Sequence, residues 1–427
     1  MGVVSCGTTM LDQGVFENLP VVTWDTTPKT STFTAANGVG YFANTSGSAF
    51  TSNLPAGSAG AVVSFADYTR TFSTNSLTIS PNGSEKIGGV AADLVLNVSG
   101  QSITLVYVDG TEGWINTNES TGQSGLLPSY IVATSPSVAT VGDYKIHTFT
   151  GPGTFTVCSV GNAGGSDTVD YLVVAGGGGG AGSHGGAAGA GGYRESVPSP
   201  AAWTASPIAN SAGAIPVSAQ AYPITVGSGG PGQNTTSNPS GKGSNSTALG
   251  ITSTGGGSIG KYSAPDGVTA GFRDGGSGAG SNAPRIAGLG NTPPVSPAQG
   301  FPGIAGANLT PHYTGGGGGG ATATSPGAGA STTASIGGAG ATSSINNSAV
   351  ARAGGGGGGI HNSSPGNAGA GGTGGGGVGG GNSGFLPAMN GTVNTGGGGG
   401  GGGAPAPNEA GGSGGSGIVI LRYKYQN

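Results

Sequence analysis

Residues 169–192 read VDYLVVAGGGGGAGSHGGAAGAGG, and this stretch decides the fold. An apolar, β-branched run over 169–174 predicts a strand. It leads directly into residues that carry almost no side chains. A chain segment of this kind cannot build a core from side chains, so the backbone itself must provide the packing if the segment is ordered.

Glycine is concentrated after this point in the 427-residue chain. Residues 1–175 hold 22 of the 99 glycines, and residues 176–417 hold the other 77. Glycine averages about 7% of ordinary proteins. The change of composition near Ala175 therefore predicts the main division of the chain.

The glycines after Ala175 form repeated runs of similar length. The runs cover 176–180, 185–192, 255–257, 315–320, 354–359, 374–381 and 396–403. Such runs are either flexible linkers or packed polyglycine II helices, which are extended and have three residues per turn. Recurrent length and spacing, with strong strands at both ends, favour a packed array whose N–H and C=O groups bond laterally.

The chain closes with a second apolar strand, GIVILRYKY at 417–425. A terminal strand of this strength needs a partner, and 169–174 is the obvious one. We therefore predict that these two strands are neighbours in one sheet and close the glycine-rich region.

The first part of the chain predicts short strands between turn residues. One hairpin is indicated by Asp109-Gly110 between two apolar runs. The fold class is therefore all-β with almost no helix: N-terminal β modules, then packed polyglycine II helices framed by strands. The expected boundaries are an attachment arm at 1–19, a β-rich oligomerisation module at 20–116, a linker at 117–140, and a glycine-rich domain at 141–427 with framing strands 143–174 and 417–425.

The module at 20–116 has short strands and few aromatic residues, so one copy is expected to bury little core. Symmetric association would compensate for this, and we expect a homotrimer. Cys6 and Cys158 lie far apart in the sequence and are expected to be unpaired.

Charge and motif patterns exclude several functions. A net charge of −4 with twelve basic residues argues against nucleic-acid binding. No apolar run of about 18 residues exists, so membrane insertion is not expected. The four histidines, His147, His184, His312 and His361, lack metal-ligand spacing. The G-x-S-x-G match at 411–415 has no α/β context. We expect no enzyme activity, no cofactor and no metal.

Side chains with binding potential lie between the glycine runs. Aromatic residues and arginine dominate interaction hot spots, so these positions are receptor-binding candidates. The alternative is that they fill and cap the ends of a core that is poor in side chains. The candidates are Tyr193, Arg194, Trp203, Tyr262, Phe272, Arg273, Phe301, His312, Tyr313, His361 and Phe385.

The framing motifs carry a resemblance. The segments GDYKIHTF at 142–149, GTFTV at 153–157, VDYLVVAGGG at 169–178 and GGSGIVILRY at 414–423 are similar to the glycine-rich domain of bacteriophage tail-fibre and other virion surface proteins, many from marine phages. The resemblance covers about residues 140–427.

This resemblance implies a virion structural protein, exposed on the particle surface, that recognises or adheres to the host cell. Its partners would be other tail, baseplate or capsid proteins and a host surface glycan or protein. Two alternatives stay open. One is a purely structural virion component, such as a head fibre or decoration protein. The other is a non-viral secreted ice-binding or surface protein built on polyglycine II.

Overall fold

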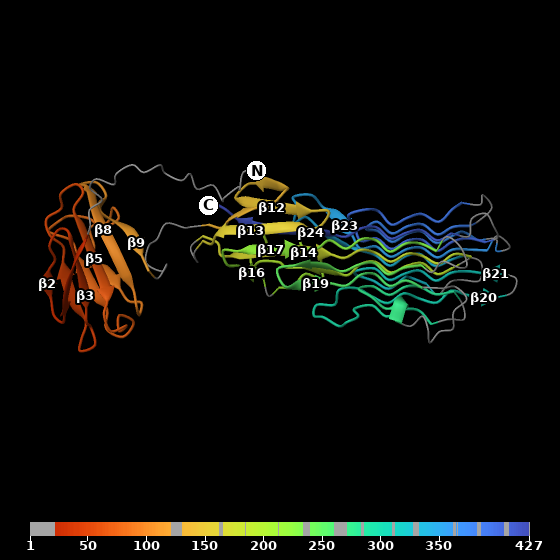
Figure 1. Cartoon of the computed structure of the whole chain (residues 1–427), viewed down its shortest axis with the longest axis horizontal. Helices are drawn as coiled ribbons and strands as arrows, with labels where there is room; N and C mark the ends of the chain where they lie inside the picture. The colour runs from red at the N-terminus through yellow and green to blue at the C-terminus, as the bar shows by residue number, and fades with distance from the viewer. Residues whose placement is uncertain are drawn as a thin grey trace, which may run out of the picture. The chain divides into compact units, whose positions relative to one another are not determined.

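The structure is a computed structural model. It describes residues 22–120, 130–161, 165–183, 185–211, 213–233, 240–259, 271–282, 286–309, 312–327, 333–361, 364, 366–381, 386–404 and 410–426. The predicted arm at 1–19 lies outside these residues. Contacts divide the chain into an N-terminal unit, which ends before Tyr130, and a C-terminal unit, which contains Tyr130–Val160 and Ser166–Asn427. Figure 1 shows the two units, red to orange and yellow to blue.

The N-terminal unit is a sandwich of two sheets. The first sheet has the order β1 (Thr23–Lys29), β3 (Val39–Ala43), β5 (Val62–Asp67), β8 (Ser102–Asp109) and β9 (Gly113–Glu119). The second has the order β2 (Phe33–Thr34), β4 (Phe50–Asn53), β6 (Leu77–Ser80) and β7 (Leu94–Leu96). Strands β1 to β6 alternate between the two sheets, and within each sheet neighbouring strands of this set are parallel, so this part of the chain forms a coil. Strands β7, β8 and β9 then join the sheets in antiparallel pairs.

Large side chains fill the space between these two sheets. Phe65, Leu105 and Trp114 are fully buried against Leu77 and Ile79 of the opposite sheet. The expectation that one copy buries little core is therefore wrong, because most of the aromatic residues described in this unit, among them Phe65, Phe72 and Trp114, are gathered between the sheets with aliphatic side chains.

The predicted linker at 117–140 is also wrong in its described parts. Strand β9 continues to Glu119, and β10 (Val132–Thr134) and β11 (Val138–Val141) already belong to the sheets of the C-terminal unit. Both strands are short and lie at sheet edges, and most of their side chains are exposed, so the sequence shows no alternation that would mark them as strands. Cys158 is disulfide-bonded, contrary to the expectation from sequence separation, which does not limit distance in space.

The C-terminal unit begins with a second sandwich. Its smaller sheet has the order β10, β13 (Gly153–Ser159) and β17 (Ala221–Ile224). Its larger sheet has the order β11, β12 (Tyr144–Phe149), β24 (Ile418–Lys424), β14 (Thr168–Val174) and β15 (Tyr193–Glu195), and β16 (Ile215–Pro216) pairs with β14. Strand β24 pairs antiparallel with β14, with Val174 opposite Ile418, so the predicted pairing of the framing strands is confirmed.

Strands β14 and β24 are buried on both faces. Val173 and Leu421 face the smaller sheet, whereas Leu172 and Ile420 face a second cluster that contains Tyr193 and Trp203. Burial on both faces explains why these strands read as unbroken apolar runs rather than as alternating patterns. Three two-stranded pairs complete the unit: β18 (Ser246–Ala248) with β19 (Ile251–Ser253), β20 (Asn308–Leu309) with β21 (His312–Tyr313), and β22 (Ala341–Ser343) with β23 (Val350–Arg352).

The glycine runs extend from this sandwich as a bundle with a three-residue hydrogen-bond period. In residues 176–181, amides three positions apart donate to the same neighbouring segment. Gly176 and Gly179 donate to Ser244 and Gly241 of one segment. Gly177 and Gly180 donate to Gly415 and Gly412 of a second segment, and Gly178 and Ala181 donate to Gly189 and Gly186 of a third. The donor-to-acceptor distances are 2.9–3.1 Å. A period of three is that of polyglycine II, because each third residue points in the same direction.

The carbonyls of the same run accept from three further segments. Their donors are Gly256, the pair Gly230 and Gln233, and the pair Gly399 and Gly402. Residues 176–181 therefore lie at the centre of six neighbouring segments. The run has no side chain beyond a methyl group, and a Cβ placed on Gly178 would lie 2.1 Å from the carbonyl oxygen of Gly257. Only glycine allows this approach.

Helix is almost absent, as predicted. Residues 271–273 are helical, and the other described residues form strands, turns or extended segments. No helix within the described ranges is long and apolar enough to cross a membrane.

Candidate functional site

The far end of the bundle holds three of the predicted residues, two of which are in ring contact. Figure 1 shows β20 and β21 at the end of the C-terminal unit opposite to β12, β14 and β24. Here the ring centroids of Tyr313 and His361 are 5.9 Å apart in an edge-on arrangement. The backbone amide of His361 donates to the carbonyl of Tyr313 at 3.0 Å. His312 precedes Tyr313 in β21. We call His312, Tyr313 and His361 the tip cluster.

Backbone pairing fixes the tip cluster in place. Thr314 bridges to Ile360, and His361 bridges to Ala404, so three separate segments meet here. The three cluster side chains are half-buried. The buried Nδ1 atom of His312 has no hydrogen-bond partner within the described residues. The cluster therefore presents partly exposed aromatic and imidazole groups on a framework of paired backbone.

Phe272 and Arg273 are neighbours in sequence but have opposite environments. The Phe272 side chain is 46% exposed, whereas Arg273 is only 3% exposed. Arg273 Nη1 donates to the carbonyl oxygen of Ile286 at 2.7 Å. Arg273 thus ties two segments of the bundle together and offers no accessible charge, which corrects its assignment as a receptor-binding residue.

Tyr193 and Trp203 are also buried, and both bind one carboxylate. Glu195 Oε2 accepts from the Tyr193 hydroxyl at 2.9 Å, and Glu195 Oε1 accepts from Trp203 Nε1 at 3.0 Å. The Ser343 hydroxyl and the Ser206 amide donate to the same carboxylate. Burial, reinforced by Glu195, raises the pKa of Tyr193 well above its usual value. These two aromatic residues therefore cap the core where the sheet meets the bundle, as the alternative interpretation predicted.

Two buried arginines and Asp170 lie close to this carboxylate. The Arg422 guanidinium stacks between the rings of Tyr144 and Trp203, at 4.3 and 5.0 Å from their centroids, and Arg422 Nη1 donates to the Ile345 carbonyl at 3.0 Å. Burial raises the pKa of Asp170 to about 6, although Ser196 and Arg422 oppose this shift. The second arginine is Arg352, which is 3% exposed. The candidates chosen from the sequence did not include Glu195, Asp170, Arg352 or Arg422. Their signal was a charged residue within a strand-forming segment, most plainly Asp170 in the apolar run of β14.

The remaining candidates are dispersed. Arg194 is half-buried in β15, and Phe301 is half-buried beside the bundle, where its carbonyl accepts from Gly278. Tyr262 and Phe385 lie outside the described residues. The histidines that the structure describes do not form a ligand set, and no group of three or more His, Cys, Asp or Glu residues there could hold a metal ion.

Over residues 148–424 the chain matches the model of a protein family described as the glycine-rich domain. The chain belongs to this family. The glycine-rich domain thus contains β13, β14, β24 and the whole bundle, together with the tip cluster. No curated protein matches the chain.

Proposed function

We propose that this protein is a subunit of a virion surface fibre that adheres to the host cell through the tip cluster. The phage-type framing motifs support the virion assignment, and the glycine-rich domain match agrees with them at the coarser level. The observation that carries the proposal is the position of Tyr313 and His361. They are aromatic, partly exposed and at the end of the bundle opposite to the framing sheet.

A polyglycine II bundle suits this role physically. Each internal run uses its amides and carbonyls for neighbouring runs, so the runs themselves have nothing left with which to select a partner. Specificity needs side chains, and these occur where the segments turn. The bundle then acts as a rigid support that holds such side chains away from the particle.

The proposed partners are other virion proteins and a host surface glycan or protein. We further propose a homotrimer, since homo-oligomers adopt closed symmetries and a three-fold axis is one of them. Sedimentation of the full chain should give three times the monomer mass. A monomer at micromolar concentration would contradict this part of the proposal without affecting the tip cluster.

Host adhesion is tested with particles that carry the double variant Tyr313→Ala and His361→Ala. Adsorption to host cells should fall at least about tenfold, because truncating a hot spot costs roughly 2 kcal/mol or more. Val138→Ala is the control, since Val138 is exposed on β11 at the opposite end of the C-terminal unit. Normal adsorption by the double variant would contradict the proposal.

One observation favours a second candidate, a purely structural virion component. Tyr193, Trp203 and Arg273 are buried and serve the packing of the unit. Labelling the protein on intact particles separates the two functions. An adhesin should be found at the host-facing end of the tail, whereas a head fibre or decoration protein should be found on the capsid.

A further inference from the structure

The N-terminal unit carries a row of aromatic rings on its first sheet. Trp24 lies in β1, Phe42 lies in β3, and Tyr68 follows β5 directly. The ring centroids of Trp24 and Phe42 are 4.8 Å apart, and those of Phe42 and Tyr68 are 6.3 Å apart. We call these three residues the aromatic row.

Strand register places this row on the face of the sheet that points away from the core. Trp24 is opposite Gly40, which is opposite Ser64, and Phe42 is opposite Ala66. Opposed residues of neighbouring strands share one face. The residues that alternate with these along the same strands, among them Tyr41, Phe65 and Ile103, face the core. Accordingly Trp24 is 40% exposed and Tyr68 is 56% exposed.

The indole of Trp24 lies flat on the backbone of β3. A Cβ on Gly40 would lie only 2.7–2.9 Å from three carbon atoms of the indole ring. Glycine at position 40 thus makes room for the ring to rest on the sheet, where Trp24 stays 40% exposed.

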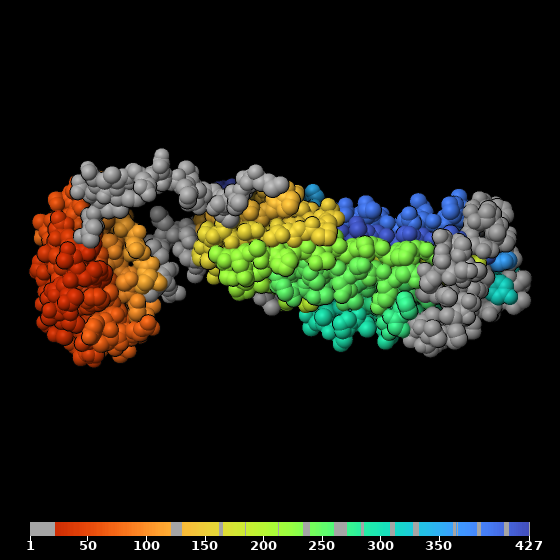
Figure 2. Space-filling model, viewed as in Figure 1, coloured from red at the N-terminus to blue at the C-terminus, as the bar shows by residue number. Residues whose placement is uncertain are grey.

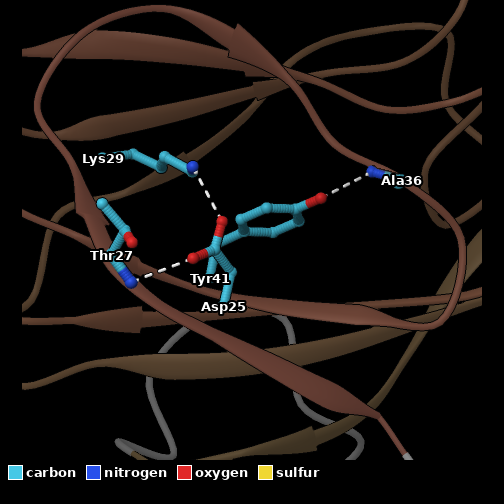
Figure 3. Close-up of polar contacts among 5 residues, drawn as sticks. All are labelled: Asp25, Thr27, Lys29, Ala36 and Tyr41. Atoms are coloured by element: carbon cyan, nitrogen blue, oxygen red, sulfur yellow. Dashed lines mark hydrogen bonds and ion pairs between the residues drawn. The ribbon is translucent and has the colours of Figure 1, made fainter.

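The edge strand that carries Trp24 is fixed by contacts on its other side (Figure 3). Asp25 pairs with Lys29 at 2.8 Å and accepts from the Thr27 amide at 2.9 Å. The Tyr41 hydroxyl accepts from the Ala36 amide at 2.9 Å, which holds the following loop. An ordered platform lowers the entropy lost on binding.

The cross-strand neighbours of Trp24 and Phe42 are small and uncharged. The paired rows that contain Trp24 and Phe42 continue with Ser64, Ala66, Ser102, Thr104 and Asn118. The Ser64 and Thr104 hydroxyls lie 2.8 Å apart. A nucleic acid or an acidic ligand would need basic groups here, and the buried centre of a protein interface would need more large apolar side chains.

From these contacts we infer that the aromatic row binds a neutral saccharide. The C–H face of a pyranose ring stacks on flat aromatic rings, and its hydroxyls bond to hydroxyl and amide side chains such as those of Thr104 and Asn118. This site goes beyond the proposed function, which places host recognition at the tip cluster of the other unit.

Tryptophan fluorescence gives a direct test on the full chain. Of the three tryptophans, Trp114 and Trp203 are buried, so the exposed Trp24 reports on ligands at this site. The probes are neutral hexasaccharides of glucose, galactose, mannose and N-acetylglucosamine, with dextran sulfate as the charged control. At least one neutral probe should shift the emission in a saturable way, and dextran sulfate should not.

Two variants keep Trp24 and test the geometry. Tyr68→Ala removes an exposed ring, and Gly40→Ala lifts the indole from the sheet. Each should weaken saccharide binding about tenfold, the equivalent of roughly 1.4 kcal/mol. Val90→Ala, at an exposed site away from the row, should bind as the unchanged protein does. The inference is overturned if no neutral probe binds, or if both row variants bind normally while their thermal unfolding is unchanged.

Discussion

The N-terminal unit and the glycine bundle of the C-terminal unit solve the packing problem in opposite ways. In the N-terminal unit, buried rings such as Phe65 and Trp114 separate two sheets. In the bundle, backbone touches backbone, and hydrogen bonds to six neighbouring segments replace side-chain contacts around residues 176–181. Large residues are therefore essential between the N-terminal sheets and excluded from the interior of the bundle. Figure 2 shows the outer surface of both units, red to orange and yellow to blue.

The difference teaches which kind of substitution each unit tolerates. Removing atoms should damage the N-terminal unit, and adding atoms should damage the bundle. The following variants test this contrast, beginning with the largest expected effect.

Gly178→Val should prevent folding of the bundle. The new Cβ would lie 2.1 Å from the Gly257 carbonyl oxygen, so neighbouring segments must separate and lose their hydrogen bonds. We expect a loss of about 3 kcal/mol or more. Calorimetry should show the transition of the C-terminal unit shifted or absent. Gly151→Ala is the control, because its Cβ would meet nothing within 4 Å. Equal melting of both variants would refute the backbone-packed core.

Phe65→Ala should destabilise the N-terminal unit by about 3–5 kcal/mol, as is usual for a buried ring. Its ring packs within 6.5 Å of Phe33 and 6.1 Å of Tyr41, measured between centroids. Tyr68→Ala in the same unit should change stability by about 0.5 kcal/mol or less, because the ring is exposed. Chemical unfolding measures both. A small effect of Phe65→Ala would mean that its neighbours close the cavity.

Two buried groups should give opposing pH dependences in the framing sheet of the C-terminal unit. Burial lowers the pKa of His147 to about 4, with Lys145 adding to the shift, and burial raises the pKa of Asp170 to about 6. The stability that neutral, buried His147 contributes is therefore lost as pH falls from 6.5, the ordinary pKa, to about 4, the pKa in the folded protein. The stability that protonated, buried Asp170 contributes is present at pH 4 and is lost as pH rises to about 6, the pKa in the folded protein. In the unchanged protein the two nearly cancel in this range.

Single substitutions should separate these contributions. Asp170→Asn should leave a protein whose stability rises between pH 4 and 6, and His147→Gln one whose stability falls. In each variant the free energy of unfolding should change by about 3 kcal/mol between pH 4 and 6. Urea unfolding at several pH values measures both. Parallel profiles for the two variants would contradict the assigned pKa directions.

Arg273→Ala and Phe272→Ala should differ although the residues are adjacent. Loss of the buried Arg273 hydrogen bond to Ile286 should cost about 1–3 kcal/mol. Loss of the exposed Phe272 ring should cost about 0.5 kcal/mol or less. Thermal unfolding compares them directly. If Phe272→Ala is the more damaging variant, the burial of Arg273 does not reflect a structural role.

Much of the fold could be predicted because it depends on local composition. Glycine runs of similar length predicted the polyglycine II array, and apolar runs at both ends predicted the pairing of β14 with β24. The candidate site was less predictable. Aromatic residues between runs looked equivalent in sequence, yet Tyr193 and Trp203 turn inward to Glu195, whereas Tyr313 and His361 meet at the tip.

The sequence by itself determined that the chain is all-β, that side chains build its first part, and that backbone must build most of the rest. Only the tertiary structure decided which run lies beside which. Every run offers the same amides and carbonyls, so no residue marks the segment 241–244 rather than another as the neighbour of 176–181. The same limit applies to Glu195 and Ser343, 148 positions apart, because a buried carboxylate finds its donors through the folded backbone and not through sequence spacing.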